Sequence, residues 1–214
     1  MGYLHAWLLG VIVWGCLGWQ GYGVVMFYFL VGSGVTRIGL ERKEAEGIAE
    51  KRSGQRGPEN VWGSALTATI CALLTLIFTP DWYPLLILGY VASFSTKLAD
   101  TTASEVGKAY GQRTFLITSL QPVPRGTEGA VSLEGTIAGI GASLLMALVA
   151  WGLGLISFLG IGLCAIAAFV ATNIESVIGA TLQSRWSWLT NEVVNIINTL
   201  IGAILAMGLA WLLT

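Results

Sequence analysis

The sequence predicts an all-α, polytopic transmembrane helical bundle of about seven spans with a cytoplasmic N-terminus. Of its 214 residues, 55% are apolar and 11% are charged, and the mean hydropathy is +0.74. A soluble domain carries roughly 25% charged residues. Residues 1–36 and 135–174 contain no Lys, Arg, Asp or Glu, and each stretch exceeds the roughly 20 apolar residues that cross a bilayer. We therefore expect residues 1–214 to form a single integral membrane domain.

Hydropathy predicts spans near residues 4–19, 22–36, 61–79, 84–99, 130–151, 153–178 and 191–213. The first 20 residues lack the basic segment and cleavage site of a signal peptide, so we expect them to remain as the first span. The first two segments are short and rich in glycine, and a single broken or re-entrant element is the alternative for them. Cys16, Cys71 and Cys164 are scattered through apolar stretches, which favours packing roles over a disulfide or a zinc site.

All eleven Lys and Arg residues fall on one predicted face of the membrane. They lie between the second and third spans, at or after the end of the fourth, and between the sixth and seventh. The connections near 19–22, 79–84 and 151–157 contain none. By the positive-inside rule the charged face is cytoplasmic, or stromal in a plastid. We therefore expect a plasma or thylakoid membrane protein whose cytoplasmic loops, 37–60 and 100–129, form the site.

The segment after the fourth predicted span concentrates polar groups on one side if it continues as a helix. These positions are Asp100, Ser104, Gly107, Lys108 and Gly111. A carboxylate, a hydroxyl, a cation and bare backbone suit a Mg²⁺-phosphate site, because Mg²⁺ prefers oxygen ligands and glycine lets a phosphate approach the backbone. The alternative is a solvated helix end with an ordinary Glu105–Lys108 pair.

The segment 122–136 is a turn rich in Gly, Thr and Glu that leads into a long apolar helix. Its polar or flexible residues are Arg125, Gly126, Thr127, Glu128, Gly129 and Ser132. The N-terminus of that helix would present free N–H groups to an anion. A capping loop is the alternative, since Thr127 and Ser132 are good caps and Gly129 is a good turn residue. Both segments lie on the same predicted face, which favours a shared site.

Further polar residues lie near the same face. Arg37 ends an apolar span at the level of lipid phosphates, and Lys43 or Arg56 could fold over a phosphate, although a solvated loop is the alternative for them. Asn191, Asn195 and Asn198 form one stripe on the last span, where Asn198 is expected to link helices. Asn173, Glu175, Asn191 and Asn195 are close enough to the charged face to line a site. Soluble phosphate-loop and dinucleotide signatures are absent from the sequence.

Together, several motifs resemble one membrane family. They are residues 36–39, 60–61, 99–108, 126–132, 174–180 and 191–195, and the Asp-Thr-Thr-Ala-Ser-Glu block within 99–108 is the most specific. The chain resembles, over about residues 7–210, the family that contains the phytyl-phosphate kinase of tocopherol biosynthesis, long catalogued as a domain of unknown function. The block also resembles those of CTP-dependent polyprenol kinases and CDP-diacylglycerol synthases. Glu128 stands where Asp is expected, and the N-terminal part is shorter by part of a helix.

The resemblance implies transfer of a phosphoryl group from a nucleoside triphosphate, expected to be CTP, to phytyl monophosphate, with Mg²⁺ as the expected cofactor. It assigns catalytic roles to Asp100, Lys108 and Arg37, and metal ligation to Asp100, Glu105 and Glu128. Expected nucleotide or phosphate contacts are Asn60, Ser104, Glu105, Gly107, Arg125, Gly126, Thr127, Gly129 and Ser132. Asn173, Glu175, Asn191 and Asn195 are the expected polar lining. The C20 tail would stay in the bilayer between helices.

Other functions fit parts of the sequence. A CTP-dependent polyprenol kinase or a lipid cytidylyltransferase is the enzymatic alternative. A lipid-phosphate transporter is the alternative of another class, but the charges cluster at one interface and not at the bilayer centre. The expected partners are an isoprenyl monophosphate and the bilayer; the net charge of −1 does not favour nucleic acid. Glycine-rich spans allow close helix packing within a monomer or across a homodimer.

Overall fold

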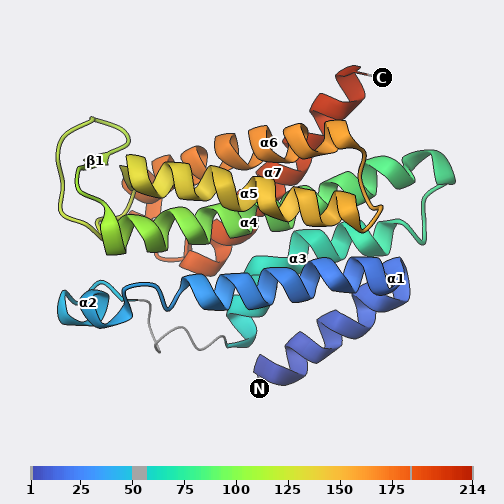
Figure 1. The fold of residues 1–214 in the computed structure, drawn as a ribbon, viewed down its shortest axis with the longest axis horizontal. Coiled ribbons are helices and arrows are strands. Elements are labelled where there is room, and N and C mark those ends of the chain that lie inside the picture. The colour runs from blue at the N-terminus through green and yellow to red at the C-terminus, as the bar shows by residue number, and fades with distance from the viewer. Residues whose placement is uncertain (1, 50–56, 184, 214) are drawn as a thin grey trace.

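A computed structural model of the chain describes residues 2–49, 57–183 and 185–213. Its long helices pack side by side in one bundle (Figure 1). The helices are α1 (Gly2–Val35), α2 (Leu40–Ala45), α3 (Pro58–Leu74), α4 (Tyr83–Tyr110), α5 (Leu133–Gly152), α6 (Phe158–Ile178) and α7 (Asn191–Leu213). A short 3₁₀ turn, η2 (Pro80–Trp82), precedes α4, and a π turn, η3 (Gly179–Gln183), extends α6. The predicted helical bundle is therefore the observed architecture.

The first two predicted spans form one element, α1, that is sharply broken at Gly18. The backbone there has φ 63° and ψ −161°, a conformation that glycine adopts without a steric penalty. Figure 1 shows the two arms of α1 folded back toward each other at an acute angle. Trp14 on one arm packs against Tyr22 on the other, with ring centroids 5.4 Å apart. The alternative of one broken element thus describes this segment.

Four helices in the described part of the chain are long and apolar enough to cross a membrane. They are Gly2–Val35, Leu133–Gly152, Phe158–Gln183 and Asn191–Leu213. The count of seven spans is therefore not confirmed. The third predicted span is shorter than expected, because α3 ends at Leu74 and has only 17 residues.

Helix α4 is the centre of the bundle. Every residue from Leu86 to Thr102 is buried, and α4 packs against α1, α3, α5, α6 and α7. Protein and not lipid surrounds this helix, so it can carry the charged pair Lys97 and Asp100, to which Asn195 of α7 adds a hydrogen bond. Its 28 residues extend about 42 Å, more than the hydrocarbon thickness of a bilayer.

The segments predicted as cytoplasmic loops contain regular structure. Residues 100–110 continue α4, so the Asp-Thr-Thr-Ala-Ser-Glu block lies on a rigid helix. A two-stranded antiparallel sheet then follows, in which β1 (Thr114–Leu116) pairs with β2 (Ala130–Ser132); the all-α prediction did not include it. The other predicted loop, 37–60, contains α2 and the first residues of α3. Residues 50–56, including Arg56, lie outside the described residues.

The connections gather at two opposite ends of the bundle. Helix α2 and strand β1 lie at one end, and the α3–α4 and α5–α6 connections lie at the other (Figure 1). This arrangement agrees with the two faces inferred from the charge distribution. Which end faces the cytoplasm stays a prediction from the positive-inside rule. The end that carries α2 and β1 is called the polar end below.

Candidate functional site

A cavity of about 850 Å³ lies at the polar end. Helices α4, α5, α6 and α7, the start of α3 and residues 125–132 surround it. Most predicted site residues line it: Asn60, Asp100, Ser104, Gly107, Lys108, Arg125, Gly126, Thr127, Glu128, Gly129, Ser132, Asn173, Glu175, Asn191 and Asn195. Segments that are far apart in the sequence therefore contribute to one polar site.

Four of the predicted positions do not line the cavity, namely Arg37, Lys43, Glu105 and Gly111. Arg37 is exposed beyond the end of α1 and is not among the residues lining the cavity. Glu105 is 1% exposed and forms a buried ion pair with Lys43 on α2. Its other oxygen lies 3.6 Å from the ammonium group of Lys108, which is the ordinary intrahelical pair considered above. Glu105 and Lys43 therefore connect α2 to α4, and neither lines the cavity.

Lys97 is a cavity residue that the sequence analysis did not select. Its Nζ lies 2.5 Å from Asp100 Oδ2 and 2.7 Å from Asn195 Oδ1. Both charged side chains are buried, and a buried charge needs a paired and hydrogen-bonded partner. The ammonium group therefore fixes the orientation of the Asp100 carboxylate. The signal was available in the sequence, because residues three apart share one side of a helix.

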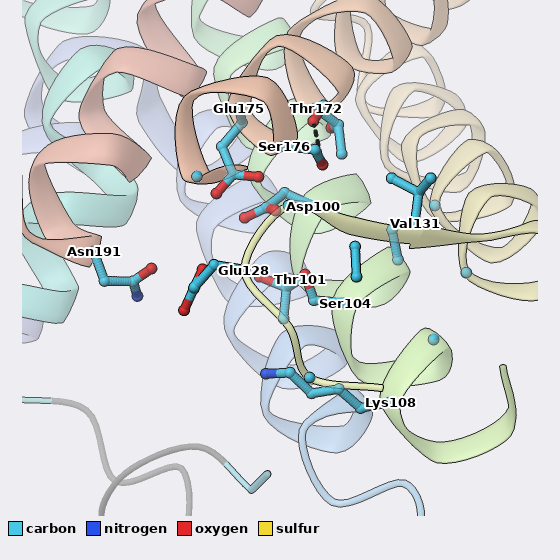
Figure 2. A pocket seen from close by; sticks show the side chains of 18 of the residues that line it. Asp100, Thr101, Ser104, Lys108, Glu128, Val131, Thr172, Glu175, Ser176 and Asn191 are labelled. Atoms are coloured by element: carbon cyan, nitrogen blue, oxygen red, sulfur yellow. Dashed lines mark hydrogen bonds between the residues drawn. The ribbon is translucent and has the colours of Figure 1, made fainter. Parts of the chain in front are cut away.

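Carboxylates from three separate segments converge in the cavity. Figure 2 shows the side chains of Asp100, Glu128 and Glu175 directed toward the same space. The charges of Asp100, Glu128 and Lys97 all act on the Glu175 carboxyl. Like charges held this close repel unless a proton or a cation lies between them. Lys97 compensates part of this negative charge, and the remainder favours a bound cation.

The donor set fits Mg²⁺ that also binds a phosphorylated substrate. In the described part of the chain, no group of three His, Cys, Asp or Glu residues is placed to enclose a metal ion. Mg²⁺ usually takes one or two protein carboxylates and completes its shell with water and substrate phosphates. Asp100 together with Glu175 or Glu128 supplies that number of oxygen ligands. Glu128, where Asp was expected, still places a carboxylate in the cavity.

Basic side chains lie nearer the solvent. Lys108 follows Asp100 by eight residues on α4, about 12 Å along the helix axis, and lines the same cavity. Arg125 also lines it, and its guanidinium donates to both carboxylate oxygens of Glu46, at 2.6 and 2.9 Å, and to Ala109 O at 3.4 Å. Asp100 is buried within the cavity, whereas Lys108 and Arg125 are partly exposed and Glu128 is exposed.

Glycines shape the turn that carries Glu128. Gly126 has φ +82° and Gly129 has φ +74°, which favour glycine. A Cβ at position 129 would lie 2.5 Å from Ser176 O, so only glycine lets the turn approach α6 this closely. The turn then leads to Ser132, which caps α5 by accepting a hydrogen bond from Gly135 N at 3.1 Å. The N-terminal turn of α5 borders the cavity, a favourable position for an anion.

Several further lining residues were missed, namely Glu59, Thr101, Thr172, Ser176 and Glu192. Each of them is the immediate neighbour in the sequence of a residue that was predicted to line the site. Asn198, which was expected to link helices, is fully buried, but its amide has no hydrogen-bond partner among the described residues. All three cysteines are free thiols, in agreement with the packing role predicted for them.

Comparisons with known proteins place the chain in a family. The integral membrane protein DUF92 family matches residues 1–203. An uncharacterized membrane protein of Synechocystis sp. is 70% identical over 97% of this chain and 81% of its own length. The chloroplastic protein VTE6 of Arabidopsis thaliana is 44% identical over 96% of this chain and 63% of its own length. An uncharacterized membrane protein of Methanocaldococcus jannaschii is 32% identical over 96% of this chain and 83% of its own length.

No solved structure matches the chain. The family predicted from the motifs is nevertheless confirmed, because the match covers nearly the whole chain and the relatives in both a cyanobacterium and a plant exceed 40% identity. The chain belongs to the integral membrane family DUF92.

Proposed function

We propose that this protein is an isoprenyl-phosphate kinase that transfers a phosphoryl group from a nucleoside triphosphate, with CTP as the expected donor, to phytyl monophosphate. The observation that carries the proposal is one cavity lined by the carboxylates of Asp100, Glu128 and Glu175 and by the ammonium groups of Lys97 and Lys108. The motif resemblance to the phytyl-phosphate kinase family and the 44% identity to a chloroplastic relative support it.

The reaction needs charge neutralisation more than proton transfer. An oxygen of the acceptor monophosphate attacks the γ-phosphorus of the donor, and the bond from that phosphorus to the oxygen bridging to the β-phosphate breaks. The products are the isoprenyl diphosphate and the nucleoside diphosphate. Because the attacking oxygen is already anionic, no general base is required. Catalysis then depends on positioning the two substrates and stabilising the charge on the transferred group.

The residues of the cavity suit these tasks. Asp100, with Glu175 or Glu128, would hold Mg²⁺, which neutralises phosphate oxygens when bound. Lys97 orients Asp100 through the 2.5 Å contact. Lys108 and Arg125 line the cavity and would pair with phosphate oxygens. The N-terminal turn of α5 adds backbone N–H groups to the same region.

The first test is turnover of phytyl monophosphate by the purified protein with CTP and Mg²⁺. Replacing Asp100 by Asn removes a metal-binding charge, and we expect kcat to fall by about 100-fold or more, as when one essential electrostatic group is lost. Asp81→Asn is the matched control, because Asp81 precedes α4 at the opposite end of the bundle. Near-normal turnover of Asp100→Asn would remove the site assignment.

The fate of the nucleotide separates the kinase from its alternatives. With γ-labelled CTP the label should appear in the lipid product, and with α-labelled CTP it should not. Retention of the α-label in the lipid would identify a cytidylyltransferase, and phosphorylation of a free polyprenol would identify a polyprenol kinase. Lipid-phosphate flux in proteoliposomes without nucleotide consumption would favour a transporter. Farnesyl, geranylgeranyl and phytyl monophosphates, each with CTP, ATP, UTP and GTP, would define specificity.

A further inference from the structure

The cavity extends beyond the polar end, along α5 and α6. Gly139, Ile140 and Ser143 of α5 and Phe169 and Thr172 of α6 line this extension. Ile140 is 37% exposed and Phe169 is 45% exposed, although both line the cavity. A residue that lines a cavity and is also exposed marks a place where the cavity reaches the molecular surface. The extension therefore opens sideways between α5 and α6.

The depth of this opening places it within the apolar layer of a membrane. Ile140 lies seven residues after the start of α5 at Leu133, about 10 Å along the helix. Phe169 lies nine residues before the end of α6 at Ile178, about 13 Å along the helix. Both positions are thus well below the polar end and inside a hydrocarbon layer about 30 Å thick. The side chains at the opening are apolar, as contact with lipid requires.

At the base of the extension, glycines of α5 lie directly against the backbone of α4. A Cβ at position 135 would lie 2.5 Å from Ala103 O, and one at position 139 would lie 2.9 Å from Ala99 O. Small residues thus keep α5 against α4 beneath the opening. Where the extension meets the polar cavity, Thr172 Oγ1 is buried and has no hydrogen-bond partner among the described residues. This hydroxyl is free to contact a polar head group next to an apolar chain.

We propose that the opening between α5 and α6 admits the isoprenoid tail of the acceptor directly from the bilayer, with Ile140 and Phe169 in contact with the tail while its phosphate lies in the polar cavity. The choice of occupant rests on the proposed function, since the acceptor there is an isoprenyl monophosphate. The extension is continuous with the phosphate site. A tail that enters sideways never has to leave the apolar phase, so the hydrophobic effect does not oppose binding.

Substitution of the residues at the opening tests the path through kinetics. Ile140→Trp should narrow it and raise KM for phytyl monophosphate roughly tenfold, the scale of one misfit in an apolar pocket. The rise in KM should be much smaller for dimethylallyl monophosphate, because its C5 chain is too short to reach the opening. Phe169→Ala is the second variant and should shift the preference toward bulkier tails. Ile137→Trp and Ile166→Trp are the matched controls and should keep the wild-type KM. Ile137 and Ile166 lie on the same two helices, are 61% and 55% exposed, and do not line the cavity.

Photo-crosslinking tests the same path without any need for turnover. A phytyl monophosphate analogue with a diazirine in its second isoprene unit should label α5 near Ile140 and α6 near Phe169, and excess phytyl monophosphate should prevent the labelling. Protected labelling without turnover would refute the proposed kinase reaction and leave the tail path intact. Labelling elsewhere, labelling that the competitor does not prevent, or equal KM values for Ile140→Trp and Ile137→Trp would overturn the path.

Discussion

Lys97 and Asp100 form a buried pair one helical turn apart on α4. The Lys97 ammonium group is the hydrogen-bond donor that holds Asp100, and it also donates to Asn195 of α7. Glu175 of α6 reaches the same carboxylate. Removal of the ammonium group would leave carboxylates facing one another in a buried position, which is strongly unfavourable. Lys97 therefore contributes both to the packing of α4, α6 and α7 and to the geometry of the site.

We expect Lys97→Met to lower the free energy of unfolding by about 3–5 kcal/mol, the usual consequence of removing one partner of a buried pair. Turnover should fall together with stability, and Lys97→Arg should retain part of the stability and part of the turnover. The measurement is the thermal midpoint in detergent together with kcat. Lys108→Met is the comparison, because Lys108 is partly exposed and should lose turnover with little loss of stability. A wild-type midpoint for Lys97→Met would contradict this account.

Helix α2 is an element that tertiary contacts hold in place. Its six residues are too few to form a stable helix alone. Lys43 donates to Thr36 O at 3.0 Å and to the Glu105 carboxylate of α4. Glu46, which follows α2, accepts hydrogen bonds from Arg125 next to the cavity. The buried pair thus positions α2, and α2 in turn positions a cation of the proposed phosphate site.

Lys43→Met should destabilise the protein by about 3–5 kcal/mol, because it leaves the Glu105 carboxylate buried with its main partner missing. Combining it with Glu105→Leu should recover most of that loss, since an apolar pair replaces both charges. Arg42→Ala is the matched control from the same helix; its pair with Glu46 is exposed and should contribute no more than about 1 kcal/mol. Thermal midpoints and hydrogen exchange in residues 40–45 measure the difference. Equal effects of Lys43→Met and Arg42→Ala would refute the role assigned to the buried pair.

At the scale of the whole molecule, the cavity joins two environments. Its polar part lies at the end with α2 and β1, while residues of α5 and α6 farther along the bundle line the opening. Under the proposed function, a water-soluble donor would enter the polar part from the aqueous side, and a lipid acceptor would reach the opening from the bilayer. This arrangement also explains why charged residues gather at one end of a chain with so few of them.

The orientation of the bundle is testable with two cysteines. Gln112→Cys at the polar end should react with a membrane-impermeant maleimide only from the cytoplasmic face, and Asp81→Cys only from the other, as the positive-inside rule predicts. Both positions are exposed. Cys16→Ser provides the background, because Cys71 and Cys164 are buried. Sealed vesicles of the two orientations give the measurement, and labelling of both cysteines from the same face would rule out the predicted topology.

Some features of the site could be predicted because they depend on local spacing. The face formed by Asp100, Ser104, Gly107 and Lys108 follows from helix periodicity alone, and all four line the cavity. Glu105 shows the limit of motif resemblance: it lies in the most specific block, yet five residues after Asp100 it is turned about 140° away on the helix. Its partner is Lys43, 62 residues distant in the chain. Sequence spacing gives no sign of that contact.

The sequence by itself determined that this is a helical membrane protein with its charges at one end, because hydropathy and charge accumulate residue by residue and need no knowledge of packing. The tertiary structure decided which polar residues share the cavity, that Gly18 breaks α1, that Lys97 holds Asp100, and that the cavity opens between α5 and α6. These features depend on contacts between segments distant in the chain, and such contacts exist only once the helices have packed around α4.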